Sequence, residues 1–454
     1  MSEDEKKCWQ DVAALAEAYL AAESAGGLLP ACAPETLAAD ERFLLGSEGV
    51  SHAEWINRLG SIMEATPSTS HSRFVNQLFG GRIPEAVAAD MLALLANSSM
   101  YTYKAAGAQV MVENEVLRKM LATAGMTGGE GSFMPGGSAA NLGAMLLARH
   151  QRFPTVRDNG LAGTGAATVY TSADAHYSIR KNAGILGVGR HYVRAIPVGP
   201  DGAMVPDKLE TAIRKDLEQG CTPMCINATA GTTVRGAFDR LDRIGHIARE
   251  HGIWFHVDGA LGASLLLSPT WRSRLEGIAL ADSLTWNPHK MMGVALQTSV
   301  LLVRQRGLLA GCLDESADYL FQAHEDDFNP GHRSLQCGRR NDAFRLWSAW
   351  SRLGDRGWAA RIDRQMALAQ EAARRIDADP LLELLEQPPS INVCFNLRGV
   401  APEEVCARLD DSGILKIGHG QVGGRSGIRL VCVNPELGQA GIARILDAVK
   451  SCHA

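Results

Sequence analysis

The segment Asn287-Pro-His-Lys290 places a lysine behind a proline and in front of two apolar residues, Met291 and Met292. Lysines on protein surfaces usually stand among polar neighbours, so this setting predicts an ammonium group removed from water. Desolvation lowers the pKa of an amine and leaves a nucleophile that can condense with an aldehyde. Lys290 is therefore the first candidate for covalent chemistry.

Two other segments offer groups that such a lysine would need nearby. In Phe133-Met-Pro-Gly-Gly-Ser-Ala-Ala-Asn141, a glycine turn opens an apolar helix, where N–H groups and the helix dipole can hold a phosphate. Alone, such a turn is more often a plain connection, and it lacks the lysine of a P-loop and the dinucleotide spacing. In Trp254-Phe-His-Val-Asp258, an apolar strand ends in a carboxylate, which could equally cap a helix.

Together these segments supply what pyridoxal 5'-phosphate requires. The cofactor needs an anion cradle, a lysine for its aldehyde, and a carboxylate that keeps its pyridine nitrogen protonated. A protonated ring withdraws electrons from the Cα of a bound amino acid. The order of phosphate turn, Asp258 and Lys290 along the chain fits the large domain of an aminotransferase-like fold.

The elements around these residues predict an α/β protein in three parts. Residues 1–70 have helical periodicity and are interpreted as an N-terminal arm. Residues 71–340 alternate short apolar runs, from Ala167–Tyr170 to Ser299–Val303, with amphipathic stretches, which predicts a mostly parallel sheet covered on both faces. Residues 341–454 begin in a long helix and continue into a small α+β domain. The polar stretch 316–341 is predicted to be a long loop.

Composition excludes several other classes of protein. The chain has 454 residues, is 46% hydrophobic and 21% charged, and carries a net charge of −5, so no basic field attracts nucleic acid or acidic lipid. Its ten cysteines have no metal-ligand spacing, so we expect reduced thiols and no metal. No apolar run is long enough to span a bilayer. We expect a soluble, cytoplasmic protein.

The chain resembles the group II pyridoxal-phosphate decarboxylases, in the branch of the glutamate, cysteine sulfinate and aspartate enzymes. The resemblance covers about residues 71–435. It is carried by ten segments in order: His71–Phe79, Ser98–Lys104, Phe133–Asn141, His176–Ile179, Asn227–Val234, His256–Ala260, Asn287–Gly293, Tyr319–Gln322, Leu335–Arg340 and Arg429–Pro435. It implies an aminotransferase-like fold with a seven-stranded, mostly parallel sheet, α-decarboxylation, and a homodimer with the active site at the subunit interface.

The resemblance also implies roles for individual residues. His176 would stack on the pyridine ring and contact the substrate carboxylate, and Tyr319, in a lid, would return a proton to Cα. Thr232 would bond near the ring hydroxyl or phosphate, and Ala260 would lie against the ring face. Four residues would share the phosphate: Ser138, Ala139, Asn287 and His289.

Three further positions suggest a short acidic substrate. Arg429 matches the family's carboxylate-binding arginine, and Gln77 and Phe79 match residues on the other side of the pocket. A phenyl ring at 79 shortens the pocket, and one methylene is worth about 1–3 kcal/mol of discrimination. Aspartate, giving β-alanine, or cysteine sulfinate, giving hypotaurine, is favoured, with glutamate and 3-methylaspartate as alternatives. One departure from the family is Leu261, which stands where relatives carry a tryptophan.

Two other functions remain open on these residues. An aminotransferase or aldolase would share Lys290 and Asp258 but would have no reason to carry the Tyr319-Leu-Phe-Gln lid. A non-catalytic scaffold descended from such an enzyme would be expected to lose the cofactor residues, and here they are present.

Overall fold

The computed structural model describes residues 1–27, 29–30, 33–315 and 328–453. Its centre is a seven-stranded sheet in the order β1-β7-β6-β5-β4-β2-β3. The strands β3, β2, β4, β5 and β6 run parallel, and β7 runs antiparallel to both of its neighbours. The strands are β1 (Glu130–Phe133), β2 (Ala167–Ser172), β3 (Val193–Ile196), β4 (Thr222–Thr229), β5 (Trp254–Asp258), β6 (Ser283–Trp286) and β7 (Val300–Val303).

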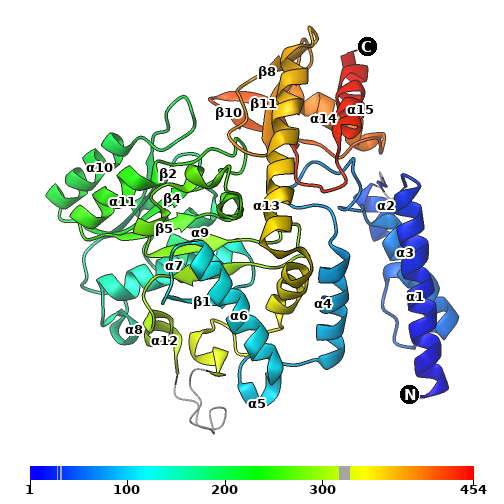
Figure 1. Cartoon of the computed structure of the whole chain (residues 1–454), viewed down its shortest axis with the longest axis horizontal. Helices are drawn as coiled ribbons and strands as arrows, with labels where there is room; N and C mark the ends of the chain where they lie inside the picture. The colour runs from blue at the N-terminus through cyan, green and yellow to red at the C-terminus, as the bar shows by residue number, and fades with distance from the viewer. Residues whose placement is uncertain (28, 31–32, 316–327, 454) are drawn as a thin grey trace.

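Helices cover both faces of this sheet (Figure 1). Side chains alternate along β5, so Phe255 lies against Gly245 on one face while His256 bonds to Asn141 on the other. Burial on both faces explains why the parallel strands read as nearly continuous apolar runs. The covering helices are α6 (Ala108–Thr123), α7 (Gly137–Arg152), α8 (Val156–Asn159), α9 (Ser178–Ile185), α10 (Pro206–Glu218), α11 (Leu241–Glu250) and α12 (Leu308–Leu313).

A second, antiparallel sheet in the order β10-β11-β9-β8 forms the C-terminal part. The long helix α13 runs from the large sheet to this one, with a kink at Gly354 (φ 62°). The elements of this part are α13 (Asp342–Asp377), β8 (Leu382–Leu384), β9 (Asn392–Leu397), α14 (Pro402–Asp411), β10 (Gly418–Val422), β11 (Arg425–Val431) and α15 (Gln439–Lys450).

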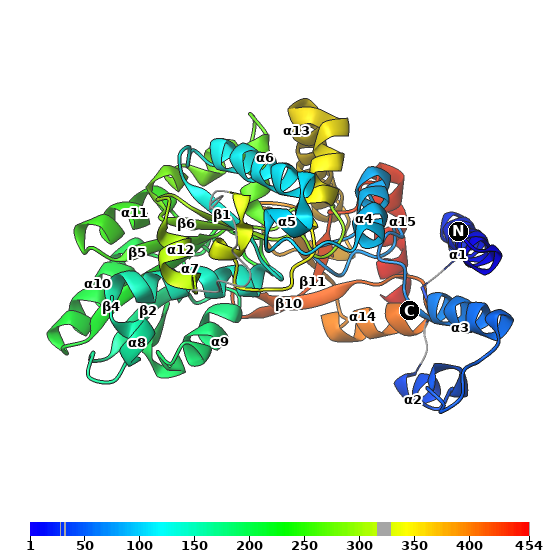
Figure 2. The same ribbon diagram turned by 90° about the horizontal axis from the view of Figure 1, so that it is seen from below.

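The N-terminal helices project from one side of the molecule (Figure 2). No residue of α1 is buried. Among the described residues, no helix has the length and apolar character that crossing a membrane requires. The first five helices of the chain are α1 (Glu3–Ser24), α2 (Pro34–Ala38), α3 (His52–Ala65), α4 (Pro84–Ala96) and α5 (Tyr103–Ala106). The domain boundaries near residues 70 and 340 stay predictions.

The fold class is confirmed. The predicted strands from β2, which begins at Ala167, to β7, which ends at Val303, are confirmed as well. Three strands were not predicted: β1, β8 and β10. Glu130-Gly-Ser-Phe and Gly418-His-Gly-Gln-Val lack the β-branched pattern of a strand, and they form because neighbouring strands offer backbone partners.

Candidate active site

A cavity of about 200 Å³ lies where β4, β5 and β6 end. This edge is where open α/β sheets bind ligands, because the loops after parallel strands separate there. Seven of the predicted site residues line it: Ser138, His176, Asp258, Ala260, Asn287, His289 and Lys290. A larger cavity, about 440 Å³, lies near the other ends of these strands and holds none of the predicted residues.

Lys290 follows β6 and faces this cavity with protein around its amine. Desolvation lowers the pKa of Lys290, the carboxylate of Asp258 opposes that shift, and the charge of Arg429 adds to it. The amine is therefore closer to its neutral, nucleophilic form than a surface lysine.

Asp258 is the last residue of β5, and its carboxylate is held at both oxygens. Asn141 Nδ2 lies 2.8 Å from Oδ2, and the backbone N–H of Ala260 lies 3.1 Å from Oδ1. Only 5% of Asp258 is exposed. The carboxylate thus has a fixed orientation beside Lys290, as a partner for a ring nitrogen requires.

The glycine turn packs closely against Asn287. Gly136 (φ +93°) precedes α7, and a Cβ on Gly137 would lie 2.5 Å from Asn287 Nδ2. Asn287 is buried, yet its Oδ1 has no hydrogen-bond partner among the described residues. A cradle without side chains, at a helix N-terminus and beside an unsatisfied amide, fits a phosphate-bearing group.

His176 has one ring nitrogen occupied by the backbone. The N–H of Ser178 lies 3.2 Å from His176 Nδ1, which must therefore accept the hydrogen bond. Burial lowers the pKa of His176, with opposition from Asp258. In its neutral form the ring carries its proton on Nε2, which leaves a donor for a ligand in the cavity.

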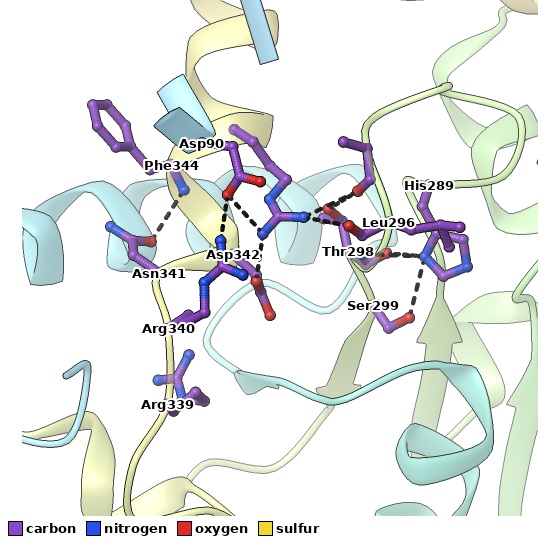
Figure 3. Close-up of polar contacts among 12 residues, drawn as sticks. Asp90, His289, Leu296, Thr298, Ser299, Arg339, Arg340, Asn341, Asp342 and Phe344 are labelled. Carbon is purple, nitrogen blue, oxygen red and sulfur yellow. Dashed lines mark hydrogen bonds and ion pairs between the residues drawn. The ribbon is translucent and has the colours of Figure 1, made fainter. Parts of the chain in front are cut away.

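His289 is held by the segment before β7 (Figure 3). Its Nδ1 lies 2.7 Å from the carbonyl oxygen of Thr298. Arg345 of α13 anchors the same segment, donating to Leu296 O at 2.9 Å.

Arg345 in turn pairs with Asp90 at 2.9 Å and with Asp342 at 2.8 Å. Asp90 belongs to α4 and Asp342 to α13, and the two carboxylates lie near each other (Figure 3). The loop that carries Lys290 and His289 is thereby tied to two helices outside the large sheet.

The predicted substrate residues lie apart from the cofactor cavity. Arg429 of β11 donates from Nη1 to Thr233 O (2.9 Å) and from Nη2 to Asn76 O (2.5 Å), and Thr233 lines the cavity. Arg429 is only 9% exposed and has no carboxylate partner among the described residues. Gln77 is exposed and Phe79 half-buried, and neither lines the cavity.

Two of the predicted cofactor residues, Thr232 and Ala139, do not line the cavity. The hydroxyl of Thr232 accepts a hydrogen bond from the N–H of Ala237. The residues on either side of it, Gly231 and Thr233, line the cavity. Ala139 lies one residue beyond Ser138 in α7 and does not line it. Tyr319 lies outside the described residues. The roles assigned to these residues stay predictions.

Several lining residues were not singled out from the sequence: Gly137, Asn141, Tyr177, Thr229, Gly231 and Thr233. Asn141 carried the clearest signal, because a buried amide one turn inside an otherwise apolar helix needs polar partners. Thr229 and Thr233 flank the end of β4, where a ligand edge was already expected.

Comparison with known proteins is consistent with this geometry. The conserved domain of pyridoxal-dependent decarboxylases matches residues 56–398. Cysteine sulfinic acid decarboxylase of Mus musculus is 40% identical over 431 residues, covering 89% of this chain and 87% of that protein. Acidic amino acid decarboxylase GADL1 of Bos taurus is 35% identical over 428 residues, covering 89% and 82%. The crystal structure of mouse CSAD in apo form has a TM-score of 0.94 at 35% identity, covering 99% of this chain and 98% of that one.

Proposed function

The chain belongs to the pyridoxal-dependent decarboxylases, and on that premise we propose that it removes the α-carboxylate of a short acidic L-amino acid, aspartate or cysteine sulfinate. Arg429 carries the proposal. A buried guanidinium without a counter-ion is costly, and an anionic ligand would offset that cost. The relatives that act on cysteine sulfinic acid or on acidic amino acids support the same class of substrate.

Bound pyridoxal phosphate supplies a sink for the electrons that remain on Cα when carbon dioxide leaves. The residues around the cavity would hold it in three ways. Lys290 would offer an amine whose pKa burial lowers, Asp258 would accept from the protonated ring nitrogen, and the α7 N-terminus with Asn287 and His289 would bind the phosphate.

The remaining groups would act on the substrate. His176 Nε2–H would donate to a substrate carboxylate and the ring of His176 would cover the cofactor ring, while Arg429 would bind the side-chain carboxylate or sulfinate. Tyr319 would return the proton to Cα, in keeping with the family.

Phe79 supports the choice of a short acid. Its segment is tied to the C-terminal part of the chain by two backbone bonds, from Val75 N to Lys416 O just before β10 and from Val431 N of β11 to Val75 O. The phenyl ring thereby stands three residues from Asn76, whose carbonyl holds Arg429. Although Phe79 does not line the cofactor cavity, a large ring on the segment that contacts Arg429 is expected to leave less length for the substrate's side chain.

We also propose an isologous homodimer. Four apolar residues of α4 are between 54% and 59% exposed: Met91, Leu92, Leu94 and Leu95. A patch of this kind favours a protein interface over open solvent. Sedimentation velocity should give the mass of two chains, and a monomer at micromolar concentration would contradict the dimer.

The decisive experiment measures carbon dioxide release from aspartate, cysteine sulfinate, glutamate and 3-methylaspartate side by side. We expect aspartate or cysteine sulfinate to exceed glutamate in kcat/KM by about tenfold or more. Phe79→Ser should raise the relative rate with glutamate, and Phe79→Tyr, which keeps the ring, should not. A wild-type preference for glutamate would overturn the short-acid proposal.

A further inference from the structure

A row of buried side chains continues from Asp258 away from the cavity. Asn141 Nδ2 lies 2.8 Å from Asp258 Oδ2, and His256 Nε2 lies 3.1 Å from Asn141 Oδ1. Ser283 Oγ lies 2.9 Å from His256 Nδ1 and 2.9 Å from Trp254 Nε1. Asn141, His256 and Ser283 are each at most 1% exposed. The row therefore runs through the dry interior of the sheet from the catalytic edge toward the larger cavity, which Trp254 lines.

The two ends of the row, the carboxylate of Asp258 and the indole N–H of Trp254, set the direction of the hydrogen bonds between them. An ionised carboxylate only accepts, so the amide of Asn141 must present Nδ2 to Asp258 and Oδ1 to His256. His256 Nε2 must then donate to Asn141 Oδ1, and the hydroxyl oxygen of Thr285, 3.4 Å from the same nitrogen, is a second, longer acceptor. Burial lowers the pKa of His256 to about 4, so near neutral pH its ring has one proton, and Nδ1 must accept from Ser283.

Ser283 closes the row at its other end. The indole N–H of Trp254 only donates, so Ser283 Oγ accepts from it and gives its own proton to His256. Every donor in the row then points toward Asp258. Bonds aligned in this way polarise one another, and a dry interior strengthens them.

We propose that His256 and Ser283 are positioning residues that aim the carboxylate of Asp258 at the ring nitrogen of the cofactor. They act through Asn141, whose amide is held in one of its two flip states by the donor on His256. The inference rests on the proposed function, because the pairing of Asp258 with the ring nitrogen belongs to that proposal.

Asn141 also connects this row to His176. Its second amide hydrogen goes to Ser178 Oγ at 3.1 Å, and the backbone N–H of Ser178 bonds to His176 Nδ1. A flipped amide would place Oδ1 against Asp258, a repulsive contact, and would remove the donor to Ser178. The donor on His256 therefore selects the only amide orientation that satisfies both neighbours.

The chain contains a matched control for the end of the row. Ser264 is buried and also accepts an indole N–H, from Trp286 at 3.0 Å, but it does not contact His256. Ser264→Ala and Ser283→Ala therefore remove the same kind of bond from equally buried sites. Only Ser283→Ala also removes the proton given to His256.

The test compares binding of two cofactors to the apoprotein, followed by quenching of tryptophan fluorescence. One is pyridoxal phosphate, and the other is its 1-deaza analogue, in which carbon replaces the ring nitrogen. A hydrogen bond to a charged group is worth about 1.5–3 kcal/mol, so His256→Leu should weaken pyridoxal phosphate by about tenfold or more. The analogue cannot pair with Asp258, and its affinity should change by less than about twofold. We expect His256→Gln, which restores a donor, to recover most of the loss.

Ser283→Ala should produce a smaller loss, for pyridoxal phosphate alone, and Ser264→Ala should change neither affinity. Equal weakening of both cofactors, or of neither, would overturn the positioning role. If His256→Leu does not fold, Ser283→Ala and His256→Gln still decide the question. A wild-type protein and Asp258→Asn that bind both cofactors alike would instead contradict the proposed pairing of Asp258 itself.

Discussion

The guanidinium of Arg429 and the carbonyl of Asn76 meet at 2.5 Å, although 353 positions separate the two residues in the chain. This contact brings β11 of the C-terminal sheet to the segment that carries Gln77 and Phe79. A second carbonyl, from Thr233 at the rim of the cavity, receives the other terminal nitrogen of Arg429. Three distant parts of the sequence, at Asn76, Thr233 and Arg429, therefore meet at one guanidinium.

Arg429→Gln should lower kcat/KM for an acidic substrate by about a hundredfold. The reason is the loss of one or two charge-assisted hydrogen bonds, each worth about 1.5–3 kcal/mol. The matched control is Arg425→Gln, because Arg425 lies on the same strand but is exposed and pairs with Glu383. Steady-state kinetics with aspartate and cysteine sulfinate provide the measurement. An equal loss in both variants would show that β11, rather than the guanidinium, had been damaged.

Gly137→Ala should weaken pyridoxal phosphate by about tenfold and leave the fold intact. The added Cβ would lie 2.5 Å from Asn287 Nδ2, so the amide must leave its position beside the glycine turn. Gly311→Ala is the control, because a Cβ there meets nothing within 4 Å in another helix. Equilibrium titration of the apoproteins gives the affinities, and circular dichroism checks the fold. An unchanged affinity in Gly137→Ala would separate this turn from the phosphate.

The residues that could be placed from the sequence are those whose burial or function shows in a local pattern of residue types. Asp258 and Lys290 could be placed because each follows an apolar strand, and parallel strands end at one edge. The strand Gly418–Val422 could not be predicted from the sequence. It forms because β11 offers backbone hydrogen-bond partners, and its own residues carry no strand pattern. The contact of Arg429 with Asn76 is likewise a property of the tertiary fold. Tyr319, predicted to return the proton, lies outside the described residues and stays a prediction.

The apoprotein should lose stability as the pH falls from 6.5 toward 4. Burial lowers the pKa of His256 and of His289 to about 4, against 6.5 in the unfolded chain. Between pH 6.5 and 4 each of these histidines is protonated in the unfolded chain but neutral in the folded protein. The free energy of unfolding therefore falls by up to about 1.4 kcal/mol per pH unit for each histidine. Asp239 opposes this below pH 6, because burial raises its pKa to about 6 and the folded state takes up its proton first.

A variant comparison isolates one histidine from these opposing groups. Between pH 7.5 and 5.0, the wild-type protein should lose about 2 kcal/mol more than His256→Gln in urea unfolding experiments. His191, which is exposed, provides the control substitution. Identical losses in the wild type and in His256→Gln would mean that His256 takes up its proton equally well in the folded protein.

Lys290→Met should remove activity and at the same time stabilise the apoprotein. The side chain of Met has nearly the same length, but it has no amine to condense with the cofactor and no charge to desolvate. Because desolvation lowers the pKa of Lys290, its ammonium form is disfavoured in the folded state. The gain in unfolding free energy, about 1 kcal/mol or more, should therefore be present at pH 7 and shrink as the pH rises toward 10.5, where the unfolded lysine also becomes neutral. Chemical denaturation at pH 7 and pH 10 measures this difference. A variant that is less stable than the wild type at both values would show that the lysine serves the fold rather than the chemistry.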